Sequence, residues 1–135
     1  MILVTGGTGL AGSHLLLELT SRGKHVRALR RKSSSIAFVQ HVFRHYATAP
    51  EKQLAQIQWV EGDILDFQSL EDAMEDVDQV YHNAAMVSFS RADRLQMHRI
   101  NVEGTANVVN SALHKGVKKL CHISSIAALG RAKLN

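Results

Sequence analysis

Residues 5–13, which run Thr-Gly-Gly-Thr-Gly-Leu-Ala-Gly-Ser, lie between an apolar run and a helical pattern. Glycines let the backbone turn tightly and approach a phosphate closely, and the following helix would present free N–H groups and its positive dipole end. Two spacings overlap here, G-x-G-x-x-G and G-x-x-G-x-x-G. The context predicts a loop for the pyrophosphate of a dinucleotide, and a glycine-rich turn without a ligand is the other interpretation. The residues expected at the pyrophosphate are Gly6, Gly7, Thr8, Gly9, Leu10, Ala11 and Gly12.

A patch of basic residues follows this loop in the sequence. The chain has 16 Lys and Arg against 12 Asp and Glu, but six of the bases lie within positions 22–32, a stretch without an acid. The charge is therefore local, which argues against a nucleic-acid partner. Arg30 and Arg31 stand near the position where a dinucleotide fold carries an acid for the ribose hydroxyl. Since arginine can clamp a 2′-phosphate, they favour NADP over NAD, and a solvated basic loop is the alternative.

The elements that would position these residues alternate along the chain. Short apolar runs predict strands at 1–5, 25–29, 57–60, 79–82 and 120–124. The first helix is expected at 10–22, and the last two strands should be joined by a long helix. This alternation predicts an α/β fold, a Rossmann-type doubly wound parallel sheet with strand order 3-2-1-4-5. The residues expected to face the core are Ala11, Leu15 and Leu19 in the first helix, Leu95, Val102, Ala106, Val109 and Leu113 in the long helix, and Val39, Val42, Phe43 and Tyr46 in a helix limited by Pro50.

Length and composition exclude several classes of protein. The 135 residues suffice for one domain, which we take as 1–135, and one cysteine excludes a disulfide framework. We expect Cys121, in the last strand, to be a buried small hydrophobe. The histidines show no carboxylate clustering, so no metal is expected. No apolar run approaches the ~20 residues of a membrane span, and no signal peptide is evident, so we expect a cytoplasmic protein.

The glycine segment Val4–Gly12 resembles the cofactor loop of the extended short-chain dehydrogenases/reductases, the NAD-dependent epimerase/dehydratase family. Segments 61–64, 80–85, 101–108 and 122–125 resemble further motifs of that family, in order and spacing. The resemblance implies that the Asp63 carboxylate and the Ile64 N–H hold adenine. It places Ala84 and Ala85 beside the nicotinamide ribose and implies that His82 fixes a loop. Asn101, which steadies the central strands, and Ser124 complete the implied cofactor site.

Catalysis in the resembled family uses a tyrosine, a lysine four residues later and a serine. The resemblance assigns the serine to Ser125, with Ser124 as the alternative. Of the two tyrosines, Tyr46 has Pro50 at the lysine position and Tyr81 has Ala85. We therefore interpret the chain as the N-terminal cofactor-binding part of a longer reductase, epimerase or dehydratase, truncated before the Tyr-x-x-x-Lys helix and the substrate domain.

The implied substrate is a small-molecule carbonyl or secondary alcohol. Residues 26–31 resemble the dihydroflavonol-reductase-like and steroid-dehydrogenase-like branch of the family more than its sugar-nucleotide epimerases. The longer protein could be a homodimer. The alternative function is a non-catalytic NADP sensor or scaffold of the atypical short-chain type.

Overall fold

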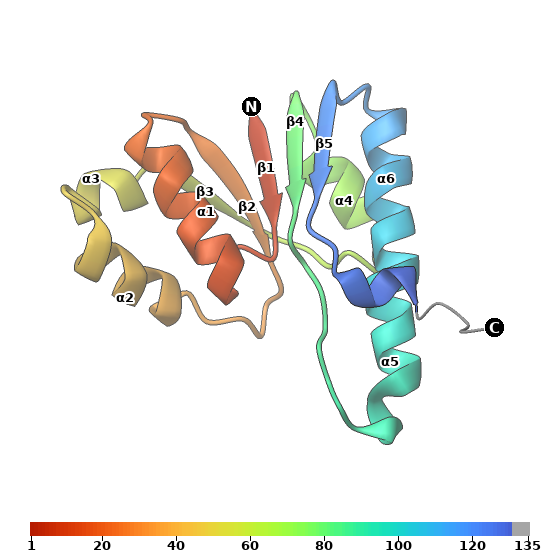
Figure 1. The fold of residues 1–135 in the computed structure, drawn as a ribbon. Helices are drawn as coiled ribbons and strands as arrows, with labels where there is room; N and C mark the ends of the chain where they lie inside the picture. The colour runs from red at the N-terminus through yellow and green to blue at the C-terminus, as the bar shows by residue number, and fades with distance from the viewer. Residues whose placement is uncertain (131–135) are drawn as a thin grey trace.

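The computed structural model describes residues 1–130, which form one five-stranded sheet with helices on both faces (Figure 1). The strands are β1 (Ile2–Thr5), β2 (Val26–Arg30), β3 (Ile57–Glu61), β4 (Gln79–His82) and β5 (Lys119–His122). All neighbours pair in parallel, in the order β3-β2-β1-β4-β5. The predicted α/β class and strand order are thus confirmed. The assignment of the whole chain to one domain stays a prediction.

Two helical layers enclose the sheet. Helices α1 (Leu10–Ser21), α2 (Ala37–Tyr46) and α3 (Pro50–Leu54) cover one face, and α4 (Phe67–Ala73), α5 (Arg94–His98) and α6 (Gly104–His114) lie on the other (Figure 1). Consecutive strand residues point to opposite faces, so Leu3 of β1 packs toward α4 and α6 whereas Val4 packs toward α1 and α2. Each layer therefore has its own apolar core.

The buried face of α1 differs from the prediction. Ala11 is exposed and Leu15 is only half-buried, whereas Leu16 and Leu19 are buried. The reason lies at the start of the helix, where Gly12 contacts the backbone of Gly6 and turns its side of the helix inward. Residues four and seven positions later then face the sheet.

The apolar face predicted for the long helix is wrong. Its five members, Leu95, Val102, Ala106, Val109 and Leu113, are all exposed. Small residues form most of the inward face instead, because they let α6 approach the sheet and α4 closely; they are Gly104, Ser111 and Ala112, together with Val108. The helix is also interrupted, since a π-helical turn, Arg99–Glu103, joins α5 to α6.

Three further expectations need correction. Val39, Val42 and Phe43 are buried as predicted, but the Tyr46 side chain is 61 % exposed. Pro50 begins α3 rather than only limiting the helix before it. Cys121 is exposed, because within residues 1–130 no helix covers its side of the edge strand β5. Over the same residues, no helix is both long and apolar enough to cross a membrane.

Candidate cofactor site

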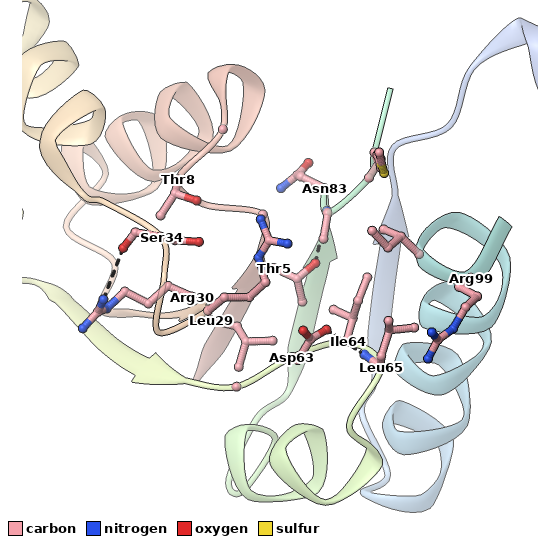
Figure 2. A pocket seen from close by; sticks show the side chains of 18 of the residues that line it. Thr5, Thr8, Leu29, Arg30, Ser34, Asp63, Ile64, Leu65, Asn83 and Arg99 are labelled. Atoms are coloured by element: carbon pink, nitrogen blue, oxygen red, sulfur yellow. Dashed lines mark hydrogen bonds between the residues drawn. The ribbon is translucent and has the colours of Figure 1, made fainter. Parts of the chain in front are cut away.

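A cavity of about 570 Å³ opens where β1, β2, β3 and β4 end. It lies at the carboxyl ends of β1 and β4, the neighbouring strands between which the strand order reverses. Open parallel sheets bind ligands at such a switch point. Four predicted segments meet there: the glycine loop, the end of β2, the end of β3 and the segment after β4 (Figure 2). The structure therefore brings together most of the residues that the sequence analysis singled out.

The glycine loop is shaped by two very close backbone contacts. Gly6 has a φ of +70°, and a Cβ there would lie 2.6 Å from the Ala84 nitrogen. A Cβ at Gly12 would lie 2.1 Å from the Gly6 oxygen. Both positions exclude any side chain for reasons internal to the protein. The close contacts at Gly6 and Gly12 pack the start of α1 and the segment after β4 against the turn of the glycine loop.

Gly9 differs from its neighbours, because the protein itself does not require a glycine there. Its φ of −85° suits any residue. A Cβ would meet only the Gly6 oxygen, at 3.4 Å, an ordinary contact. Gly9 lines the cavity, as do Gly6 and Thr8. A side chain at position 9 would therefore obstruct a ligand rather than the fold.

The other predicted loop residues lie at the rim or beneath it. Leu10 and Ala11 are exposed at the first turn of α1, whose N–H groups lack acceptors within the helix. Gly7 faces inward, with its Cβ position 3.0 Å from the Leu16 Cδ1. The lining of the cavity does not include Gly7, Leu10, Ala11 or Gly12, which lie beside or beneath it.

The two arginines after β2 both line the cavity but differ in their partners. Arg30 donates from Nη1 to the Ser34 carbonyl oxygen at 3.3 Å, and its Nη2 lies 3.5 Å from Oε1 of Glu61 (Figure 2). Its side chain is only 28 % exposed. Arg31 is exposed, and its side chain has no hydrogen bond or ion pair within the described part of the chain. The free guanidinium is thus that of Arg31.

The end of β3 supplies Asp63 and Ile64 to the cavity. Oδ1 of Asp63 accepts a hydrogen bond from the Leu65 nitrogen at 3.0 Å, and the Asp63 N–H donates to Oγ of Ser69 at 3.0 Å. These bonds fix the carboxyl group while leaving Oδ2 free to accept from a ligand. The Ile64 carbonyl accepts from Nδ2 of Asn107 at 3.0 Å, which ties this segment to α6.

The end of β4 is held by a buried histidine. Nδ1 of His82 lies 2.6 Å from Oγ1 of Thr5, and Nε2 lies 3.0 Å from Oγ1 of Thr105 on α6. Burial is the larger cause that lowers the pKa of His82 to about 4, and the neighbouring His122 adds to it. His82 is therefore neutral near pH 7 and links β1, β4 and α6, in keeping with the fixing role that the resemblance implies.

The segment after β4 is fixed by Asn101. Its Oδ1 accepts from the Met86 nitrogen at 2.8 Å and its Nδ2 donates to the Met86 oxygen at 2.8 Å. Ala84 and Ala85 line the cavity beside this clamp. Asn101 itself is no part of the lining, so it acts on the cavity through the backbone of Met86.

The two serines lie outside the cavity. Ser124 and Ser125 follow β5, both are exposed, and Oγ of Ser125 accepts from the Ala127 nitrogen at 3.2 Å. The structure does not join them to the other predicted residues, and the serine assignments stay predictions. No group of three or more His, Cys, Asp or Glu residues within positions 1–130 could hold a metal ion.

One wall of the cavity was missed by the sequence analysis. Gln96, Arg99 and Ile100 line it from α5 and the π-helical turn. They precede the Asn101 motif in the sequence, but no motif includes them. Their position at the cavity depends on how this helix is held, by Asn101 at Met86 and by Asn107 at Ile64.

A protein-family model matches nearly the whole chain. The model of the NAD dependent epimerase/dehydratase family matches residues 2–134. A "Sterol demethylase protein B" of Methylococcus capsulatus is 35% identical over 128 residues, which are 95% of this chain and 35% of that protein. A "Putative dihydroflavonol 4-reductase" of Synechocystis is 35% identical over 127 residues, 94% of this chain and 33% of that protein. The chain thus spans about a third of the length of the curated relatives it matches.

Solved structures agree with these matches. A short-chain dehydrogenase/reductase superfamily protein from Agrobacterium tumefaciens with bound NAD has a TM-score of 0.70 and 31% identity, over 93% of this chain and 32% of that one. UDP-glucose 4-epimerase from Bifidobacterium longum in complex with NAD+ and UDP has a TM-score of 0.77 and 25% identity, over 96% of this chain and 38% of that one.

Proposed function

Since the chain belongs to the NAD-dependent epimerase/dehydratase family, we propose that it binds NAD(P) in the cavity above β1 and β4. The pyrophosphate would lie over the first turn of α1, with adenine at Asp63 and the nicotinamide ribose at Ala84 and Ala85. The observation that carries the proposal is Gly9. The fold tolerates a side chain there, yet that side chain would occupy the place where a pyrophosphate approaches the backbone.

The reaction proposed for the longer protein is hydride transfer between the nicotinamide and a carbonyl or secondary alcohol of a small molecule. The bound cofactor supplies the hydride chemistry, and this chain's residues bind and orient it. The proposal places this chemistry in the cytoplasm and involves no nucleic acid. A non-catalytic NADP sensor or scaffold is the second candidate, and a Tyr-x-x-x-Lys motif elsewhere in the longer protein would decide for the enzyme.

We propose NADP as the preferred cofactor. Arg31 supports this preference, since it lines the cavity with a free guanidinium where an NAD enzyme would carry an acid. Arg30 is engaged with Ser34 and Glu61 and would hold the 30–34 turn in place.

The longer protein could also pair with a second copy of itself. Support comes from the exposed apolar stripe on the α5–α6 segment, which includes Val102, Val109 and Leu113. Exposed apolar stripes of this kind mark interaction surfaces. Sedimentation of the longer protein and of its Val109→Glu variant would test this, with a dimer expected for the first alone.

The test of cofactor binding is a titration of the 135-residue chain with NADPH and NADH. The parent should bind, and Gly9→Val should not, although its circular dichroism and melting temperature stay close to those of the parent. Ala106→Val is the control, because Ala106 is an exposed small residue of α6 outside the cavity, and this variant should bind as the parent does. Binding that survives Gly9→Val, or a parent that binds neither cofactor, would refute the proposal.

A further inference from the structure

Gln96, Arg99 and Ile100 line the same cavity as the segment that follows β3. In Figure 2 the Arg99 side chain leaves its helix on the side of Leu65, next to Ile64 and Asp63. This is the end of the cavity where the proposed function puts adenine. A cationic side chain that no motif explains therefore stands beside the expected position of an aromatic ring.

The backbone that carries Arg99 is held at both walls of the cavity. Asn101 bonds to both backbone groups of Met86, and Asn107 donates to the Ile64 oxygen. A Cβ at Gly104 would lie 2.6 Å from Cδ1 of Ile64, so the helix touches the β3 end without a spacer. The π-helical turn shifts the register of the residues before Asn101 relative to α6. Arg99 thus projects from a fixed base.

The guanidinium itself is only loosely bound within the protein. Nε of Arg99 lies 4.0 Å from Oε2 of Glu103, and the two side chains are 65 % and 55 % exposed. An exposed pair at this separation contributes little and is easily replaced by another partner. Arg99 can therefore turn toward a ligand at small cost.

We propose that Arg99 stacks its guanidinium on the adenine ring and forms the outer wall of the adenine site, an inference that rests on the proposed function. A planar guanidinium stacks well on aromatic faces, and the contact excludes water from one side of the ring. Asp63 and Ile64 then hold the edge of the ring, and Arg99 holds a face. The contact is independent of the 2′-phosphate, so it contributes equally to NADP and NAD.

The experiment measures binding of NADPH, NADH, ADP, adenosine and nicotinamide mononucleotide to the full chain, with the last three as competitors. Arg99→Ala should weaken both dinucleotides, ADP and adenosine by a similar factor, about 2- to 5-fold, and leave nicotinamide mononucleotide unchanged. Arg94→Ala changes an exposed arginine at the start of α5, outside the cavity, and should change none of these affinities. Glu103→Gln removes the competing carboxylate and should leave affinity equal to the parent's or tighter.

The outcomes separate the two proposals. If the parent binds and Arg99→Ala changes no affinity, the role of Arg99 is refuted and the proposed function stands. If Arg99→Ala weakens ADP but not the uncharged adenosine, the guanidinium attracts phosphate and does not stack, which also refutes it. A parent that binds no adenine nucleotide overturns both.

Discussion

Thr5 and His82 form a buried hydrogen bond of defined direction. They are directly opposite each other on β1 and β4, 2.6 Å apart through Oγ1 and Nδ1, and both are fully buried. Oγ1 of Thr5 also accepts from the Ala84 nitrogen at 3.3 Å. Its own hydrogen has no other acceptor nearby within residues 1–130, so it donates to Nδ1. The imidazole is then the Nε2–H tautomer, which donates to Thr105.

Acid should destabilise the protein through this histidine. The folded pKa of His82 is lowered from 6.5 to about 4, so the unfolded chain binds the extra proton first as the pH falls. The contribution of neutral His82 to the free energy of unfolding is fully present above pH 6.5. It is lost progressively as the pH falls toward 4, by up to about 3 kcal/mol. Urea unfolding at pH 7, 5 and 4 measures the loss, and His82→Gln should reduce the dependence on pH over this range. The prediction fails if parent and variant lose stability in parallel.

Alanine at position 12 should unfold the chain, whereas alanine at position 9 should not. The Cβ of Gly12→Ala would meet the Gly6 oxygen at 2.1 Å, and Gly9→Ala makes an ordinary 3.4 Å contact. We expect a loss of roughly 3 kcal/mol or more for the first and under ~1 kcal/mol for the second. Thermal melts of the two variants decide the matter, and equal melting temperatures would contradict the geometry of the loop.

The two arginines after β2 should affect cofactor choice unequally. Arg31→Ala should weaken NADPH by about tenfold or more and leave NADH unchanged, because one charge-assisted contact is worth roughly 1.5–3 kcal/mol. Arg30→Ala should have a smaller effect, since its guanidinium already binds Ser34 and Glu61. Lys24→Ala, which lies before the start of β2 and outside the cavity, serves as the control. If the parent binds NADPH and NADH with equal affinity, the proposed NADP preference is wrong and the basic residues after β2 form only a solvated loop.

Removal of the Asn101 amide should loosen the segment after β4. Asn101→Ala loses both bonds to Met86 and should cost about 1–3 kcal/mol, with weaker cofactor binding. Asn101→Asp keeps the bond from the Met86 nitrogen but turns a carboxylate oxygen toward the Met86 oxygen, so it should not restore stability. Asn110→Ala, exposed on α6, is the matched control. Unchanged stability in Asn101→Ala would show that the clamp is unimportant.

The 135-residue chain alone should not turn over a carbonyl substrate with NADPH. Its tyrosines have Pro50 and Ala85 at the position of the family's lysine, so the proton-transfer pair is missing. Absorbance at the NADPH band, followed with a panel of ketones and aldehydes, tests this. Any turnover above background would require another acid–base group in this chain.

The strands and their order were predictable because most strands are short apolar runs between turn residues, as is typical of a parallel sheet. The helix faces were not. In α6 the inward face consists largely of Gly104, Ser111 and Ala112. These residues are buried because their small side chains let the helix approach the sheet closely, and not because they are strongly hydrophobic. A periodicity of large apolar residues therefore identified the outward side. Helix α4 was missed as well, although Asp66 caps it in the usual way.

The candidate site divides along similar lines. Gly6 was predicted from the glycine spacing, whereas Asp63 and Ala84 were predicted from the family resemblance. All three line the cavity because strand ends of a parallel sheet meet at one edge. Arg99 was not, because its place depends on how the helix is clamped to Met86 and Ile64. The partners that distinguish Arg30 from Arg31 also depend on the turn that follows β2, and the sequence alone does not specify it.

The position of β5 bears on how this chain behaves at high concentration. Within residues 1–130 β5 pairs with β4 alone, and all four of its residues are exposed. A strand edge with open N–H and C=O groups can add a strand from another molecule and so begin aggregation. Lysine on an edge strand opposes this by charge, and Lys119 is the one permanently charged residue of β5. Loss of the Lys119 charge should therefore favour association of the isolated chain through this edge.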